Sequence, residues 1–316
     1  MAEANVVYLS PTGTDAVPCS RALPCKGLRF SVQQASEIRS HLVFATGMYD
    51  LGFQGVNLDT QSTTATRLFL HGGGATLTGG SSDGGLTLRL PATLRDLEIV
   101  NPTVGSSQAL YISSSAVLER VRLRGYNGLA NVGQVTARRL TIDAQGPGIA
   151  NTGALTIDGA MIVGGTTAIW SRQGSVDVTN LLAYGASGIA IDIEGSGGSI
   201  AFSTIYSTAQ GTDPAGVRCA IAPLTIRSSI VWTPTSPTPR VGVVGSCILT
   251  STIVGPIGVA GAMNTDPSFV SANANNFHLN GGSPARDAVD AGPAMDFEGD
   301  PRPRGARFDI GADEAP

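Results

Sequence analysis

The stretch LERVRLRGYNGLANVGQVTARRLTID, residues 118–143, contains one complete repeat and the start of the next. Its apolar residues are spaced as apolar, two residues, apolar, one residue, apolar, as in Leu118, Val121 and Leu123. The same pattern occurs at 94–99, 137–142, 157–162 and 178–183, with weaker copies at 200–205 and 226–231. The first positions are separated by 24, 19, 20, 21, 22 and 26 residues. A period this short indicates a solenoid of stacked coils.

A second column of aliphatic residues keeps the same period. Its members, each preceded by Ala or Gly, are Leu110, Leu129, Ile149, Ile169, Ile189 and Val217. One coil of about twenty residues cannot bury its apolar side chains alone, but coils stacked about 4.8 Å apart can. The pattern therefore predicts an all-β fold, a right-handed parallel β-helix. The leucine-rich repeat signature is absent, and a propeller needs a longer period.

The composition excludes several classes of protein. Only 14% of the residues are charged, the net charge is −4 and the single lysine is Lys26, so nothing indicates nucleic-acid binding. No apolar stretch is long enough to insert into a membrane. Apolar residues make up 42% of the chain, enough for a large core.

The two ends differ from the repeats, as a solenoid that must protect its terminal coils requires. Residues 27–39 are predicted to form a short amphipathic capping helix, with Leu28, Val32, Ala35 and Ile38 as candidates for its apolar face. We expect one continuous domain with an N-terminal cap at 1–41, coils at 42–265 and an irregular C-terminal cap at 266–316, which should cover the far end.

Four cysteines, Cys19, Cys25, Cys219 and Cys247, form one local pair and one pair about a repeat apart. We expect two disulfides and therefore an oxidising compartment. The alternative is a metal site, but the spacing of zinc ligands is absent.

Both ends resemble a known group of proteins. The N-terminal motifs are VYLSPTGTD at 7–15 and FATGMYDL at 44–51, and the C-terminal ones are DPSFV at 266–270, GSPARD at 282–287, DPRP at 300–303 and DIGADE at 309–314. The chain resembles bacterial secreted parallel β-helix repeat proteins, with a C-terminal region similar to the choice-of-anchor Q domain. The resemblance implies a secreted or cell-surface location, with the signal peptide and any anchor outside this sequence.

Stacking the coils brings charged residues together. Arg122 and Arg124 are predicted beside Glu98 and Asp143. One interpretation is a solvated ladder of opposite charges. The other is a groove for an acidic sugar, in which an arginine acts as a base near Asp143. Asp158 with Asp177, or Asp177 with Asp192, are weaker candidates for the carboxylate pair of a glycosidase.

The seventh position of the pattern carries an aromatic side chain in three successive coils, Tyr184, Tyr206 and Trp232. An exposed strip of this kind would suit stacking on sugar rings, and a structural aromatic ladder is the alternative.

In the tail, Asp296, Glu298 and Asp300 alternate and could bind Ca²⁺, although ion pairs with nearby arginines also explain them.

The sequence favours an exported, noncatalytic surface protein, a glycan-binding or adhesin-like module whose partner is an extracellular polysaccharide or cell-surface glycan. One alternative is an enzyme, a polysaccharide lyase or glycoside hydrolase, and it rests on analogy with other β-helix proteins. Another is a purely structural spacer. Whether the protein is an enzyme stays open at this point, and Ca²⁺ is the single cofactor considered.

Overall fold

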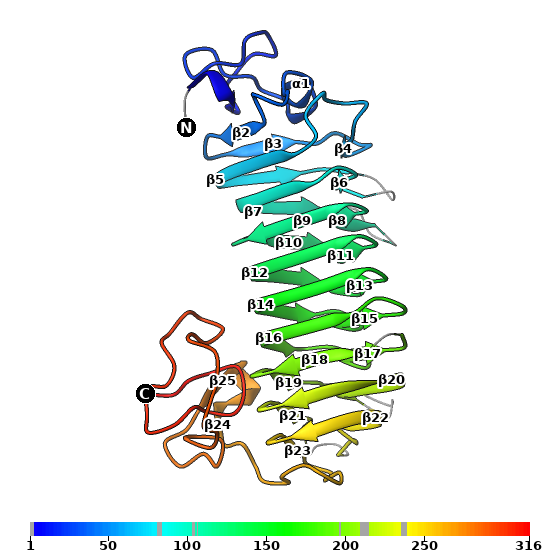
Figure 1. Ribbon diagram of the computed structural model, residues 1–316, viewed down its shortest axis with the longest axis vertical. Helices are drawn as coiled ribbons and strands as arrows, with labels where there is room; N and C mark the ends of the chain where they lie inside the picture. The colour runs from blue at the N-terminus through cyan, green and yellow to red at the C-terminus, as the bar shows by residue number, and fades with distance from the viewer. Residues whose placement is uncertain are drawn as a thin grey trace. The chain divides into compact units, whose positions relative to one another are not determined.

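The computed structural model describes residues 3–80, 84–102, 105, 107–195, 197–208, 215–234 and 239–316. It confirms the predicted parallel β-helix, because almost every strand pairs in parallel with the strand one coil further along the chain. Within each part of the chain, Figure 1 shows the strands of successive coils one below another. The chain divides into two compact units, Met1–Gly146 and Pro147–Pro316.

In the parts that the structure describes, the first unit contains two short helices and twelve strands. Their bounds are η1 (Glu3–Asn5), β1 (Val6–Leu9), α1 (Leu28–Gln33), β2 (His41–Phe44), β3 (Met48–Asp50), β4 (Val56–Leu58), β5 (Leu68–Thr78), β6 (Leu86–Leu88), β7 (Ala92–Asn101), β8 (Gln108–Ile112), β9 (Ser115–Glu119), β10 (Arg122–Gly125), β11 (Asn127–Asn131) and β12 (Gln134–Ala144).

These strands build three faces. Face A consists of β1, β2, β9 and the first halves of β5, β7 and β12. Face B consists of β3, β10 and the second halves of β5, β7 and β12. Face C consists of β4, β6, β8 and β11. Because side chains alternate along a strand, every second residue points into the coil and the others point outward.

The inward positions form ladders of aliphatic side chains. On face C, Leu86, Leu110 and Leu129 lie in register in three successive coils. All three side chains are completely buried. Burying a leucine side chain contributes about 1.5–3 kcal/mol, so the repeat itself supplies much of the stabilisation of the coils.

The spacing of the repeat follows from a corner between faces A and B. Its third position is left-handed in coil after coil, as at Asp96 (φ 54°), Arg120 (φ 52°) and Arg139 (φ 53°). The left-handed residue interrupts the alternation of the strand, so the next inward side chain comes one residue later than it would in a continuous strand. The first, fourth and sixth positions of the pattern therefore all point inward. The two-residue gap in the sequence pattern is therefore the corner, and the one-residue gap is ordinary strand alternation.

The N-terminal cap is held by the predicted Cys19–Cys25 disulfide and by a helix shorter than predicted. The helix α1 covers six residues, and its Leu28 and Val32 side chains are buried. Ala35 is also buried, but the inclusion of Ile38 in the apolar face is wrong, because the helix has already ended and this side chain is 79% exposed.

The second unit contains thirteen strands and one 3-10 helix among its described residues. Their bounds are β13 (Ile149–Asn151), β14 (Ala154–Gly164), β15 (Ile169–Ser171), β16 (Val176–Tyr184), β17 (Ile191–Ile193), β18 (Gly198–Ala201), β19 (Thr204–Tyr206), β20 (Val217–Arg227), β21 (Ile230–Trp232), β22 (Val243–Thr250), β23 (Ile253–Gly255), β24 (Phe269–Ser271), η2 (Ala272–Ala274) and β25 (Asn276–Leu279).

The coils of this unit repeat the same three faces, with one change of register. On face C, Ile169 pairs with Ile191, which in turn pairs with Val217. The prediction that Ile189 belongs to this column is wrong by two residues. This coil is longer than the one before it, so the turn before β17 absorbs the extra residues and Ile189 lies there, partly exposed.

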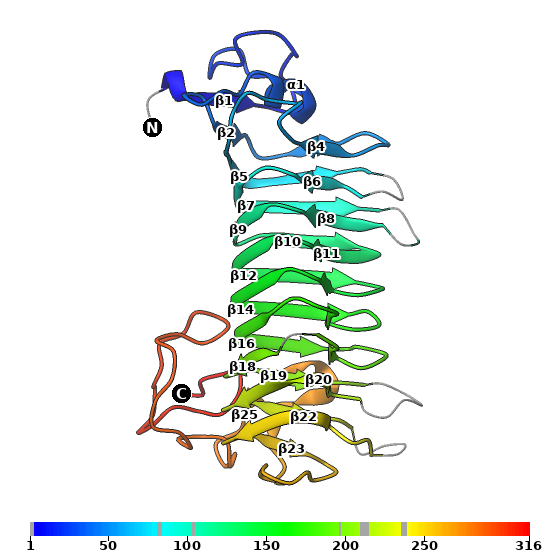
Figure 2. The ribbon, with the colours of Figure 1, turned by 45° about the vertical axis from the view of Figure 1, so that its right-hand side comes forward.

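The C-terminal segment, residues 266–316, lies along face B of its unit, and not across the end of the coils as expected. Figures 1 and 2 show its orange and red residues beside the flank that carries β19 and β21. It contributes Leu279, Ala285 and Ile310 to a buried cluster with Phe202 and Ile230. The Cys219–Cys247 disulfide, also predicted, links β20 to β22.

Candidate functional site

The arginines and the aspartate predicted from the repeat lie together on face B of the first unit. Arg124 lies 3.5 Å from Glu98 and 3.9 Å from Asp143, and Arg122 is in register with Glu98. A hollow of about 260 Å³ is lined by Arg124 and Asp143. Both side chains are more than half exposed, so water screens the ion pairs and they stabilise the fold little.

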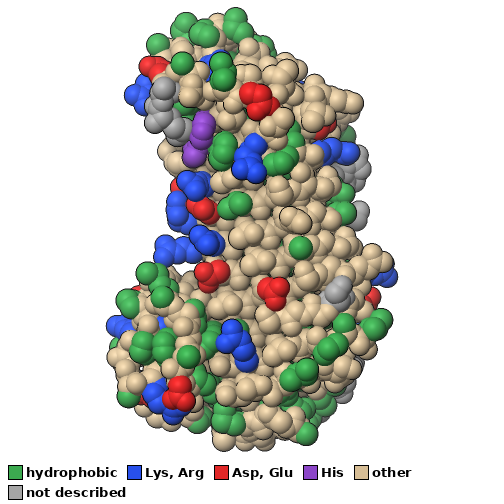
Figure 3. Space-filling view, in the orientation of Figure 1, with side chains coloured by type: hydrophobic (Ala, Val, Ile, Leu, Met, Phe, Trp, Pro, Cys, Tyr) green, Lys and Arg blue, Asp and Glu red, His purple; other side chains and the backbone are tan. Residues whose placement is uncertain are grey.

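The neighbouring corner carries a more regular charge ladder. Arg95 contacts Glu119 at 2.7 Å, and Arg120 donates two hydrogen bonds to Asp96, at 2.6 and 2.9 Å. The bonds from Arg120 hold the pKa of Asp96 below its usual value. Basic and acidic side chains gather along one margin of the molecule in Figure 3. In each pair the charge of one side chain compensates the charge of the other, as the interpretation as a ladder of opposite charges requires.

The aromatic column is present but it is not an exposed strip. Tyr184, Tyr206 and Trp232 are in register in three coils, as predicted. However, Tyr206 is only 8% exposed, because the C-terminal segment packs Phe269 and Phe277 against it. The structural-ladder alternative accounts for this packing, and a glycan-binding role for the three residues stays a prediction that the burial of Tyr206 does not favour.

The aspartates considered for a glycosidase are not paired in register, and a catalytic role for them stays a prediction. Asp177 is in register with Thr156 and not with Asp158. Asp192 is on face C, where Arg218 binds it with two hydrogen bonds of 2.7 Å. Trp170 lies next to Asp192 in the same outward column, and the guanidinium of Arg172 lies 4.9 Å from its ring centre.

The acidic tail residues have mostly structural partners. Asp296 accepts hydrogen bonds from the backbone N–H groups of Glu298, Gly299, Asp300 and Glu314. Asp300 forms an ion pair with Arg304 at 3.1 Å. Oxygens of Asp296, Glu298 and Asp300 still lie within 4.8 Å of one another and could hold a metal ion. Ca²⁺ binding at these three residues stays a prediction.

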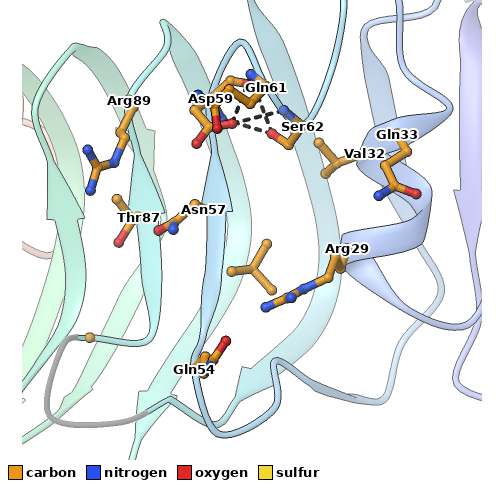
Figure 4. A pocket seen from close by; sticks show the side chains of 12 residues that line it. Arg29, Val32, Gln33, Gln54, Asn57, Asp59, Gln61, Ser62, Thr87 and Arg89 are labelled. Carbon is orange, nitrogen blue, oxygen red and sulfur yellow. Dashed lines mark hydrogen bonds between the residues drawn. The ribbon is translucent and has the colours of Figure 1, made fainter.

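A different site, which the sequence did not indicate, has the geometry of a binding pocket. It lies between α1 and face C of the first unit and has a volume of about 630 Å³. Figure 4 shows α1 on one side and the strands β4 and β6 on the other. We call it the Arg29–Arg89 pocket. It is lined by Arg29, Val32, Gln33, Gln54, Val56, Asn57, Asp59, Gln61, Ser62, Gly84, Thr87 and Arg89.

The helix places Arg29 and Gln33 in the pocket because its opposite side is buried. Leu28 and Val32 pack inward, so the residues at the i and i+4 positions 29 and 33 share the outer side. Arg29 extends toward β4 and donates a hydrogen bond of 2.9 Å to the carbonyl oxygen of Gly55. That bond holds the guanidinium in place, and no other described residue bonds to its remaining N–H groups.

The strands supply uncharged polar groups by simple alternation. Asn57 and Thr87 are in register at outward positions. The residues on either side of Asn57, Val56 and Leu58, are buried. The floor of the pocket therefore presents an amide and a hydroxyl over an apolar core.

Among the described lining residues, three side chains are charged and two of them are basic. Asp59 is fixed by a turn in which its Oδ1 accepts hydrogen bonds from the N–H groups of Gln61 and Ser62, at 3.1 and 2.9 Å. Arg89 lies on the other side of the strands from Arg29 in Figure 4. Within the described part of the chain, its guanidinium has neither a hydrogen bond nor an ion pair. An unpaired arginine in a polar hollow is ready to bind a carboxylate.

A second hollow of about 670 Å³ adjoins the pocket and shares Arg29, Gln33, Gln54 and Val56 with it. Phe53 lines this hollow and is 82% exposed. The second hollow also contains the carboxylates of Asp15 and Asp50, so the excess of basic side chains is confined to the Arg29–Arg89 pocket. Its amides and the exposed ring of Phe53 suit a hydroxyl-rich ligand.

Two signals in the sequence could have indicated this pocket. One is the strand Leu86-Thr87-Leu88, which requires Thr87 to point outward. The other is the four-residue spacing of Arg29 and Gln33 on the predicted helix. What the sequence does not reveal is that the cap places this helix beside face C.

Comparisons with known proteins support the fold. No protein-family model and no curated protein matches the chain. The crystal structure of the pectate lyase Pel9A is similar, with a TM-score of 0.60 and 13% sequence identity, over 98% of this chain and 96% of that chain. At this identity the likeness establishes the parallel β-helix fold alone. Among the described residues, no helix has the length and apolar character to span a membrane.

Proposed function

We propose that the protein is an exported, noncatalytic module that binds an acidic polysaccharide at the Arg29–Arg89 pocket. The observation that carries this proposal is the guanidinium of Arg89, which no described residue pairs with, in a polar pocket that also contains the anchored Arg29. Among the described residues that line the pocket, two arginines face the single carboxylate of Asp59. This excess of positive charge favours an anionic ligand over a neutral one.

The chemistry of the lining suits a uronate chain. A sugar carboxylate can accept two parallel N–H bonds from an arginine. The amides of Gln33, Gln54 and Asn57 both donate and accept, as ring hydroxyls require. The exposed ring of Phe53 can pack on the apolar side of a sugar. The two disulfides are consistent with a location outside the cell, where such polysaccharides occur.

The test is binding of polygalacturonate, measured by calorimetry at low and high salt. Arg89→Gln should weaken binding about tenfold or more, since a charge-assisted hydrogen bond contributes about 1.5–3 kcal/mol. Arg138→Gln is the matched control, because Arg138 is exposed on the same unit but lies outside the pocket. Equal binding by wild type and Arg89→Gln would refute the proposed site.

A second candidate function is cleavage of the same class of polysaccharide. It is favoured by the fold likeness to a pectate lyase and by the hollow that contains Arg124 and Asp143. Eliminative cleavage produces unsaturated uronates that absorb ultraviolet light, so a steady rise in absorbance that is abolished by Arg124→Gln would establish it. We expect no rise, because Arg124 already contacts two carboxylates.

A further inference from the structure

His278, on β25 in the C-terminal segment, lies between two carboxylates. Its Nδ1 is 2.8 Å from Asp313 Oδ1, and its Nε2 is 3.7 Å from Glu298 Oε2. Asp313 is fixed from its other side, since its Oδ2 accepts a hydrogen bond of 2.9 Å from the N–H of Leu279. One potential ligand atom from each of His278, Glu298 and Asp313 lies within 4.8 Å of the others.

The two nitrogens of this imidazole have different surroundings. An ionised Asp313 can only accept, so the 2.8 Å distance fits a hydrogen bond donated by Nδ1–H. In the neutral ring this tautomer leaves a lone pair on Nε2. The 3.7 Å distance to Glu298 is too long for a hydrogen bond. A tetrahedral ion with bonds of about 2.0–2.2 Å holds two ligand atoms about 3.4 Å apart. The gap is therefore close to the spacing that a shared metal ion imposes.

We propose that His278 Nε2 and the Glu298 carboxylate bind a divalent transition-metal ion of the zinc class, with Asp313 as the positioning residue. Ligating histidines usually donate their other N–H to a carboxylate, which sets the tautomer and the ring orientation. The side chains of His278 and Glu298 are 44% and 45% exposed, so water can complete the coordination.

This site differs from the Ca²⁺ site considered at Asp296, Glu298 and Asp300. An imidazole ligand favours zinc and similar ions, whereas Ca²⁺ prefers oxygen ligands alone. Asp296 is committed to the backbone and Asp300 to Arg304, so Glu298 is the member of that group that is available to a metal with His278. The bound ion would link β25 to the loop that carries Glu298 and brace the C-terminal segment.

The alternative account is a protonated His278 attracted to both carboxylates without any metal. Titration of metal-free protein with Zn²⁺ and, separately, Co²⁺ distinguishes the two. We expect one site, with a Co²⁺ absorption spectrum and a shift of the His278 ring resonances. Glu298→Gln and His278→Gln should each weaken Zn²⁺ binding at least tenfold. Asp313→Asn should weaken it about 10–100-fold.

The controls separate this site from others on the chain. Asp300→Asn should leave Zn²⁺ affinity within twofold of wild type, and so should Arg89→Gln, which tests the polysaccharide pocket independently. Thermal unfolding in chelator should be the same for wild type and Glu298→Gln, which shows that the variant is folded. Zn²⁺ binding that survives His278→Gln but is lost in His41→Gln would overturn the proposal, as would an absence of binding at millimolar Zn²⁺.

Discussion

The centres of the Phe277 and Tyr206 rings lie 4.9 Å apart, and this contact joins the C-terminal segment to face B of the second unit. Phe277 is buried and also packs 5.2 Å from the ring of Tyr184. Phe277→Ala should therefore destabilise the docked segment by about 3–5 kcal/mol. Limited proteolysis should cleave the segment faster while the coils stay intact. Phe53→Ala, at an 82% exposed ring, is the control and should leave the cleavage rate unchanged. Equal protection of the Phe277→Ala variant would contradict this account of docking.

The corner between faces A and B makes a prediction at Arg120, whose backbone is left-handed (φ 52°). A β-branched residue is strongly disfavoured there, so Arg120→Val should cost about 1–2 kcal/mol in urea unfolding. Arg120→Gly should lie closer to wild type, because glycine adopts this conformation freely and the exposed pair with Asp96 contributes less than about 1 kcal/mol. Arg122→Val, two residues later in an extended strand, is the matched control and should cost little. If the Val and Gly variants at Arg120 were equally stable, the corner would not determine the spacing of the repeat.

The sequence predicted the coils because burial repeats with each turn of the chain. The column that contains Leu110 and Leu129 is visible as a pattern, since every coil must place an aliphatic side chain at the same inward point. The column was misassigned at Ile189 because a longer turn shifts the register without changing the pattern of residue types. A neighbouring apolar residue, Ile191, fills the inward position.

Outward positions were harder to interpret, because their role depends on what covers them. Tyr206 is in register with Tyr184, as predicted, but its burial depends on Phe277, seventy-one positions further along the chain. The Arg29–Arg89 pocket likewise depends on how the cap places α1 against face C. Neither arrangement is periodic, so the repeat carries no information about it.

The stacked histidines of the first unit predict a pH dependence of stability. His41 Nδ1 lies 3.0 Å from His71 Nε2, and burial lowers the pKa of both side chains below the ordinary value. Below that ordinary value of about 6.5, the unfolded chain binds protons that the folded chain does not. The stabilisation from these neutral rings should be complete at pH 7.5 and decrease as the pH falls toward 5.

The measurement is urea unfolding at several pH values between 7.5 and 5. The double variant His41→Gln, His71→Gln should lose less stability than wild type over this range, whatever its absolute stability, because the two titrating groups are gone. A pH dependence identical to that of wild type would show that the two histidines are not its source. Arg138→Gln, which removes an exposed charge on the same unit without altering either ring, should retain the wild-type dependence.

The buried pair of Arg302 and Glu314 organises the C-terminal segment. Both side chains are fully buried 3.2 Å apart, and Arg302 also donates hydrogen bonds to the carbonyl oxygens of Gly311 and Ala312, at 2.9 and 2.7 Å. Arg302→Met leaves the Glu314 carboxylate buried without its cation and should destabilise the segment by about 3–5 kcal/mol. The double variant with Glu314→Gln should cost about 1–3 kcal/mol less than the sum of the single variants, because no uncompensated charge remains. The two single variants and the double variant are compared by unfolding in urea, with cleavage of the segment by a protease as the measure of its unfolding. Arg304→Met, which breaks the exposed pair with Asp300, should cost less than about 1 kcal/mol. Strictly additive costs for Arg302 and Glu314 would mean that the two charges do not stabilise each other.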